Sequence, residues 1–206
     1  MTGVSGLEIR GLKTTDWPNI ESLFGEHGAC GGCWCMTWRL PRGGKLYEEN
    51  KGAPNRRRFR QLVEEGNAHG LLAFEAGKAI GWCSVGPKSE FPKLENSRVL
   101  KVPAVGNDWA VLCFYIQRNH RGRRVASKML AEAINYARQN DATILDGFPA
   151  QHAAGKSLPA AFAWTGVPEI FAACGFKHIP REGTDRPLYR IEFSQADRRT
   201  ARKRSP

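Results

Sequence analysis

The feature that most constrains the fold is a continuous strand, turn and helix pattern in residues 109–139. Residues 109–116 form an unbroken apolar run of β-prone side chains, residues 118–124 are basic, and an amphipathic helix pattern starts at Val125. A strand that enters a helix through a short turn leaves several backbone N–H groups unpaired, and the helix dipole adds partial positive charge there. The sequence therefore predicts an anion-binding site at this turn.

The rest of the pattern predicts an α/β fold in which helices flank one mixed sheet. We expect helices over residues 15–26, 54–65, 125–139 and 168–174. Residues 33–40 are expected to form a short extended segment, and residues 87–103 a long loop. Strands are expected at residues 7–13, 71–75, 79–85, 109–117, 142–146, 176–179 and 188–193, the second and third of these as an antiparallel hairpin.

Length and composition favour one domain with short flexible ends. A chain of 206 residues, 41% of them hydrophobic, is large enough to bury a core. We expect a flexible N-terminus over residues 1–6, the domain over residues 7–193, and a basic, disordered tail over residues 194–206. The longest apolar run is far shorter than the roughly 20 residues of a membrane helix, and the N-terminus lacks a signal pattern. These features indicate a cytoplasmic protein with no membrane contact.

The formal net charge of +11 favours anionic ligands. Charge alone leaves phosphorylated cofactors, nucleic acid and acidic substrates open. Because no nucleic-acid-binding motif accompanies the basic residues, we do not expect a nucleic-acid partner.

Two short motifs resemble the GNAT superfamily of N-acetyltransferases. The pyrophosphate signature of that superfamily reads Gln or Arg, two variable residues, Gly, one variable residue, then Gly or Ala. Arg121 and Ala126 match its ends, whereas Arg124 stands at its central glycine. Residues 172–176 (AACGF) are similar to a landmark near the end of the superfamily's domain, a small helix followed by Gly-Phe.

The resemblance covers nearly all of residues 7–193 in element order. It implies a GNAT-like mixed, mostly antiparallel central sheet flanked by about four helices, with acetyl-CoA as co-substrate and a primary amine as acceptor. It also implies that the backbone of Phe114, Tyr115 and Ile116 holds pantetheine. The turn that would wrap the pyrophosphate consists of Arg121, Gly122, Arg123, Arg124, Val125 and Ala126. If Cβ of Arg124 points outward, its backbone can still approach phosphate, and its guanidinium can contact phosphate directly.

In this superfamily the amine attacks the thioester directly. The reaction needs a deprotonated amine, a donor for the oxyanion and departure of a thiolate, and the resemblance places the donor among the backbone N–H groups of residues 114–116. The tyrosine that often protonates the thiolate corresponds to Phe171, and an asparagine that often contacts the cofactor corresponds to Trp164. Both substitutions delete polar function.

The candidate bases are Asp108 and Asp146, which lie at the entrance of the fourth expected strand and the end of the fifth. Glu90, Glu169, His152 and an ordered water are alternatives. Each acid is equally a cap or a solvated charge.

Aromatic and sulfur-containing residues indicate where an acceptor could bind. The candidate pocket residues are Trp34, Met36, Trp38, Phe148 and Trp164, which core packing explains at least as well. The six cysteines are expected to be free thiols. His27, Cys30, Cys33 and Cys35 fall within nine residues, but the CxC step is cramped for tetrahedral zinc, so we expect buried or pocket thiols and no metal; structural zinc and a redox pair are the alternatives.

The leading interpretation is an N-acetyltransferase that acts on a small molecule or a protein as a monomer or homodimer. A GNAT-like module that binds CoA or another anion without catalysis is the first alternative, and a nucleic-acid or ribosome binder is the second.

Overall fold

The computed structural model describes residues 6–41, 45–151, 163–184 and 186–197. Short 3-10 turns cover Thr14–Asp16, Lys88–Glu90 and Arg118–His120, and a π-type turn covers Gly28–Gly32. The strands are β1 (Glu8–Gly11), β2 (Leu71–Glu75), β3 (Lys78–Pro87), β4 (Asp108–Ile116), β5 (Ile144–Gly147), β6 (Lys177–Ile179) and β7 (Leu188–Glu192). The helices are α1 (Trp17–Phe24), α2 (Lys45–Asn50), α3 (Ala53–Glu64), α4 (Pro92–Glu95), α5 (Val125–Gln139) and α6 (Pro168–Ala173).

The strands form one mixed sheet in the order β1-β2-β3-β4-β5-β7-β6. Only the central β4–β5 pair is parallel, and the other strand pairs are antiparallel. The predicted hairpin is present as β2 and β3, with Leu71 opposite Cys83 and Glu75 opposite Lys78. The expected α/β fold with a mostly antiparallel sheet is therefore confirmed.

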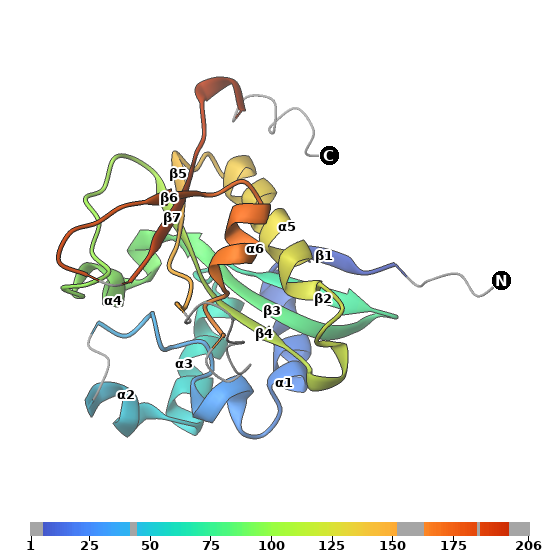
Figure 1. The fold of residues 1–206 in the computed structure, drawn as a ribbon. Helices are drawn as coiled ribbons and strands as arrows, with labels where there is room; N and C mark the ends of the chain where they lie inside the picture. The colour runs from blue at the N-terminus through green and yellow to red at the C-terminus, as the bar shows by residue number, and fades with distance from the viewer. Residues whose placement is uncertain (1–5, 42–44, 152–162, 185, 198–206) are drawn as a thin grey trace.

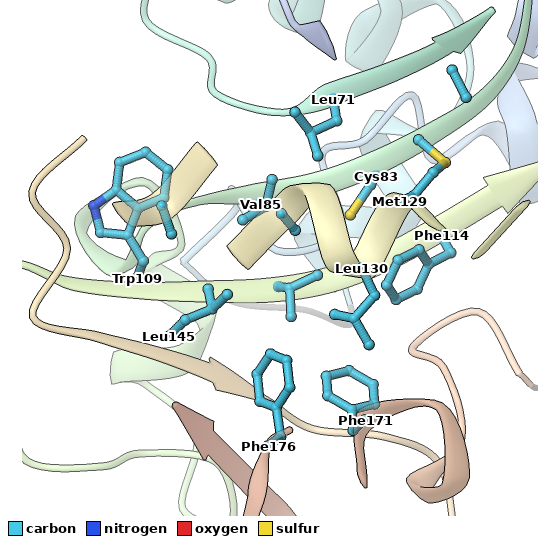
Figure 2. Close-up of a cluster of buried hydrophobic side chains, with 14 of the residues drawn as sticks. Leu71, Cys83, Val85, Trp109, Phe114, Met129, Leu130, Leu145, Phe171 and Phe176 are labelled. Carbon is cyan, nitrogen blue, oxygen red and sulfur yellow. The ribbon is translucent and has the colours of Figure 1, made fainter. Parts of the chain in front are cut away.

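Helices cover both faces of the sheet, because strand side chains alternate between two apolar clusters. Figure 1 shows α5 and α6 on one face, with α1 and α3 on the other. Cys83 and Phe114 belong to the cluster beneath α5, whereas the neighbouring Trp82 and Tyr115 pack on the α1 side. In Figure 2 the buried Met129 and Leu130 of α5 lie over these strands. This packing fixes α5, and with it the turn that precedes α5, against β3 and β4.

Helix α6 ends at the predicted glycine. Gly175 adopts φ of 88°, its N–H donates to the Ala172 carbonyl, and the Phe176 N–H donates to the Phe171 carbonyl. This pair of hydrogen bonds is a Schellman motif, in which glycine takes the left-handed position without a Cβ clash. The motif turns Phe176 back into the core, where its ring centroid lies 5.0 Å from that of Phe171.

Two expectations about local structure were wrong or incomplete, and a third is not tested. Residues 33–40 are not extended: they form successive turns, and Trp34 and Cys35 have φ of 40° and 55°. Helix α2 and the single-turn helix α4 were not predicted, since neither has a long apolar period. The predicted flexible ends fall mostly on residues 1–5 and 198–206, outside the described residues. In the described part of the chain, no helix combines the length and apolarity needed to span a bilayer.

Candidate functional site

The site is built on an open edge of β4. Strand β5 pairs with β4 only from Asp108 to Val111, so the last part of β4 runs on beyond its parallel neighbour. The β3–β4 register also shifts here, because Ser84 pairs with Cys113 but Val85 pairs with Val111, which leaves Leu112 as a bulge. Bulges re-aim the side chains that follow them. After the bulge, Phe114 faces the α5 side and Tyr115 the α1 side.

A cavity of about 870 Å³ follows this edge. Such a volume suits a drug-sized or cofactor-sized ligand. Its walls come from the end of β4, the turn before α5 and the start of α5, the segment between α1 and α2, two residues of the segment before α6, and single residues of α1, α2, β3 and α4. The lining residues are Phe24, Ala29, Cys30, Cys33, Cys35, Thr37, Trp38, Tyr47, Trp82, Lys93, Cys113, Phe114, Tyr115, Ile116, His120, Arg121, Gly122, Arg124, Val125, Ala126, Ala163 and Trp164.

The turn before α5 presents backbone donors to one end of the cavity. Helix α5 has fifteen residues, and no side chain caps its N-terminus. Its N-cap, Arg124, is left-handed, with φ of 59° and ψ of 21°. Most residues other than glycine avoid this conformation, which explains why a glycine serves at the matching signature position. An open helix start and its dipole can bind an anion, which is the property that the sequence predicts for this turn.

The basic residues of this turn have different partners. Arg121 donates from Nε to the Ile116 carbonyl at 2.9 Å. Arg123 forms an ion pair with Glu75 of β2, with N–O distances of 2.5 and 3.1 Å, and lowers the pKa of that carboxyl. His120 also reaches Glu75, at 3.1 Å. Among the described residues the Arg124 guanidinium has no hydrogen-bonding or ionic partner, although Arg124 lines the cavity.

One backbone donor on the open edge is already engaged. The Phe114 N–H donates to the Trp164 carbonyl at 2.7 Å, so the segment before α6 takes the place that a longer β5 would occupy. The Trp164 ring lies against Trp38, with centroids 5.7 Å apart. The Lys93 ammonium in turn lies 5.1 Å from the Trp38 centroid. These contacts connect β4, through Trp164, with Trp38 and Lys93, which form the far wall of the cavity.

Cysteines form one side of the cavity. Burial raises the pKa of Cys33, raises that of Cys35 to about 11 and raises that of Cys113 well above its ordinary value. Trp82 donates from Nε1 to the Cys35 sulfur at 2.9 Å. All six cysteines are free thiols, as predicted. Within the described ranges no group of three or more His, Cys, Asp or Glu side chains could hold a metal ion. Thiols kept protonated in this way are poor ligands and poor nucleophiles.

The residues predicted to bind the cofactor gather at this cavity, apart from Arg123. Arg123 points to Glu75, so its role is to tie the turn to β2. The cavity lining includes Phe114, Tyr115, Ile116, Arg121, Gly122, Arg124, Val125 and Ala126.

The predicted acceptor residues divide into two groups. Trp38 and Trp164 line the cavity. Trp34 and Met36 pack instead in the core beneath α1, and Phe148 packs in a third cluster with Trp38, Leu188 and others. Trp34 is 1% exposed, and its left-handed backbone turns it into that core, which a sequence pattern does not reveal.

Neither candidate base lies in the cavity lining. Asp146 is fully buried, accepts two hydrogen bonds from Arg190 at 2.7 and 2.9 Å, and lies 2.8 Å from Lys88. Asp108 is 3.5 Å from the same lysine and accepts a hydrogen bond from Thr143. These carboxylates are committed to a buried ion-pair cluster (Lys88, Asp108, Asp146 and Arg190), and this geometry argues against either one as the base.

The other base candidates are no closer. Glu90 forms an ion pair with Arg39 and contacts His69, and neither Glu90 nor Glu169 lines the cavity. His152 lies outside the described residues. Phe171 is fully buried among Phe176 and Tyr189, so no acid occupies that position.

Sequence reasoning missed several lining residues, notably Phe24, Tyr47, Trp82, Lys93 and His120. His120 had a signal, because it lies within the basic turn. Lys93 belongs to a one-turn helix in the segment expected to be a loop, and no local pattern marks it.

The fold and the site are those of α/β proteins in which one strand edge of the sheet is unpaired beside the start of a helix. A model of the Acetyltransferase (GNAT) family matches residues 35–157, more than half of the chain. The chain therefore belongs to the GNAT family of acetyltransferases. None of the curated proteins matches it.

Solved structures show the same fold at low sequence identity. PaiA N-acetyltransferase from Thermoplasma acidophilum, in complex with coenzyme A, is 14% identical with a TM-score of 0.51, covering 91% of this chain and 99% of that one. YncA from Salmonella typhimurium, described as a putative acetyltransferase with its cofactor acetyl-CoA, is 15% identical with a TM-score of 0.51 and coverages of 92% and 95%. YhbS from Escherichia coli, a GNAT family N-acetyltransferase in complex with CoA, is 13% identical with a TM-score of 0.51 and coverages of 96% and 87%.

Proposed function

We propose that this protein transfers an acetyl group from acetyl-CoA to a primary amine. The observation that carries the proposal is the continuity of one cavity from the uncapped start of α5 to the open edge of β4. An elongated ligand with phosphates at one end and hydrogen-bonding amides along its length suits that shape. The neighbours PaiA, YncA and YhbS were crystallised with CoA or acetyl-CoA, which supports the same assignment here. We assign residues 7–193 to one cytoplasmic domain that acts as a monomer or homodimer.

The chain's own groups suit the parts of this co-substrate. The backbone at the start of α5, with Arg121, Gly122 and Arg124, would hold the pyrophosphate. The backbone of Phe114, Tyr115 and Ile116 would hold pantetheine along the strand edge. Arg123 stabilises the turn through Glu75 rather than touching phosphate.

When bound, acetyl-CoA supplies an acyl group activated as a thioester, so that an amine can form the N–C bond as the C–S bond breaks. The Phe114 N–H, on the open edge of β4, would donate to the developing oxyanion. Because this N–H donates to the Trp164 carbonyl, the Trp164 carbonyl has to give way before Phe114 can take that role. The protonated thiols of Cys35 and Cys113 favour direct attack over transfer through a cysteine.

The cavity offers no carboxylate base. Among its described lining residues there is no Asp or Glu. We therefore expect the acceptor to enter as the neutral amine, with its proton already lost to water. The pH at which kcat/KM rises should then follow the acceptor, so two amines whose pKa values differ by about one unit should shift the rise by the same amount. Initial-rate measurements across pH check this prediction. A rise at one fixed pH for both amines would instead indicate a base on the protein, for which His120 in the lining is the candidate.

Two measurements test the function itself. Acetyl-CoA should raise the melting temperature of the protein by mass action, and free thiol should appear when an acceptor amine is added. No shift with acetyl-CoA or CoA would exclude a cofactor site at this cavity.

A melting shift without thiol release over a broad panel of amines would favour the second candidate, a non-catalytic CoA-binding module. The buried Phe171 and the absence of a carboxylate from the described lining favour that candidate.

Arg124 allows a sharper test of the phosphate site. Replacing Arg124 by alanine removes the guanidinium and keeps the left-handed backbone strain, whereas glycine removes both. We expect both variants to bind acetyl-CoA about tenfold more weakly, the effect of one lost charge-assisted hydrogen bond. The glycine variant should be about 1 kcal/mol more stable than the alanine variant, because φ at this position is 59°. Calorimetric titration and urea unfolding measure the two effects.

Arg118→Ala is the matched control, since Arg118 belongs to the same turn, is exposed and does not line the cavity. If the glycine variant binds as tightly as the parent, only the backbone of residue 124 contacts phosphate.

A further inference from the structure

The far wall of the cavity combines aromatic rings with donors that lack partners. Trp38 is 4% exposed, and its indole Nε1 is buried without a hydrogen-bond partner. Lys93 lies over the Trp38 ring, and its backbone N–H donates to the Trp38 carbonyl at 3.3 Å. Within the part of the chain that the structure describes, the Lys93 ammonium has no carboxylate partner. Burial alone lowers the pKa of Lys93, as expected for a cation without a counter-ion.

A buried indole N–H without an acceptor is unfavourable, so it marks a place where a ligand can supply an acceptor. The half-buried Lys93 ammonium, which lies 5.1 Å from the centroid of the same indole ring, suits a carboxylate, which has two oxygens and a negative charge. The wall around them is apolar and aromatic, with the Trp164 ring tilted at 41° to the Trp38 ring and its centroid 5.7 Å away. The ligand that satisfies both features has a flat or apolar body and one carboxylate.

The charge of the cavity argues against a polycationic acceptor. The described lining has no Asp or Glu, and it includes Lys93, which lies outside the turn assigned to the pyrophosphate. Polyamines and aminosugars therefore lack the carboxylates that recognise them, and they meet like charge.

We propose that the acceptor is a primary amine that carries an aromatic ring and a carboxylate, as an aromatic amino acid does. Lys93 and Trp38 Nε1 bind the carboxylate, and the Trp38 and Trp164 rings hold the aromatic body. The Trp164 backbone touches Phe114 at the strand edge, so an amine seated on Trp164 is directed toward the atoms where transfer occurs. This inference rests on the proposed acetyl transfer and specifies its acceptor.

The test compares acceptors that differ only in the carboxylate. With acetyl-CoA fixed, thiol release is measured for phenylalanine against phenethylamine and for tryptophan against tryptamine, with spermidine as the polycation. We expect each carboxylate to have at least a tenfold higher kcat/KM than its partner amine, and spermidine to be the poorest acceptor.

Lys93→Met should remove this preference by raising KM for phenylalanine at least tenfold, with a much smaller effect on phenethylamine. Trp38→Phe keeps the ring and removes the N–H, and should cause a smaller loss in the same direction. Lys101→Met is the matched control, because Lys101 is exposed and lies outside the lining. Calorimetric titration of phenylalanine into the protein with CoA gives a readout that does not depend on turnover.

The outcomes separate the two proposals. Preference for the decarboxylated amines or for spermidine would overturn the acceptor assignment and leave acetyl transfer standing. Equal losses of kcat for both members of a pair in Lys93→Met, with a changed pH profile, would make Lys93 a base instead. If no amine releases thiol and no carboxylate binds, although acetyl-CoA still raises the melting temperature, acetyl transfer itself fails.

Discussion

Replacing Asp146 by asparagine is expected to lower the free energy of unfolding by about 3 kcal/mol or more. The substitution leaves Arg190 without its bidentate partner and leaves Lys88 with only the more distant Asp108. Removing one member of a buried ion-pair cluster costs about 3–5 kcal/mol, because the remaining charges stay buried and lose their compensation. Urea unfolding followed by tryptophan fluorescence measures the loss.

The Asp146→Asn variant also decides whether this carboxylate has a chemical role. Since Asp146 lies outside the cavity lining, acetyl-CoA affinity per folded molecule should be unchanged. Glu26→Gln, an exposed carboxylate with no ionic partner among the described residues, is the control and should shift stability by no more than about 0.5 kcal/mol. A variant of parental stability that has lost turnover would restore Asp146 as the catalytic base.

Replacing Ala126 by tryptophan is expected to weaken acetyl-CoA binding at least 100-fold, or about 2.7 kcal/mol. Ala126 lies in the first turn of α5 and lines the cavity beside Arg124. A phosphate reaches the backbone N–H groups of a helix start only if the side chains there are small or turned away. An indole at this position fills the space into which the pyrophosphate has to enter. Calorimetric titration with acetyl-CoA measures the loss.

Ala131→Trp is the control, because Ala131 is an exposed residue of the same helix that lies outside the lining. It should bind acetyl-CoA like the parent. Because Ala126 is partly buried against the core, the urea midpoint of the Ala126 variant is measured alongside, and acetyl-CoA affinity is compared per folded molecule. Unchanged acetyl-CoA affinity in a folded Ala126→Trp protein would move the phosphate site away from the start of α5.

The elements with strong local signals were predictable. The apolar run of β4, the basic turn and the amphipathic period of α5 are contiguous, so the strand, the turn and the start of the helix at Val125 follow from a short stretch of sequence. Gly175 similarly marked the end of α6 through its own conformational freedom. In both cases the physics that decides the structure lies within a few residues.

The rest of the site depends on contacts between distant residues. Lys88 and Arg190 form ion pairs with Asp108 and Asp146, which argues against these carboxylates as bases. The two basic residues lie far from the two carboxylates in the sequence, so no local pattern predicts the pairs. Lys93 becomes part of the site only because α4 packs its backbone against Trp38. Trp34 and Cys35 have left-handed backbone conformations that their residue types do not predict. The sequence therefore does not reveal which aromatic side chains of this segment enter the core and which line the cavity.

The open edge of β4 has a consequence for the protein's behaviour at high concentration. A strand whose backbone groups face away from its own sheet can recruit a strand from another molecule and so begin aggregation. Here the bulge at Leu112 interrupts the straight edge, and the Trp164 carbonyl accepts a hydrogen bond from the Phe114 N–H. Both devices are those by which proteins prevent edge-to-edge association. Protection against self-association is thus built into the same strand edge to which we assign acyl transfer.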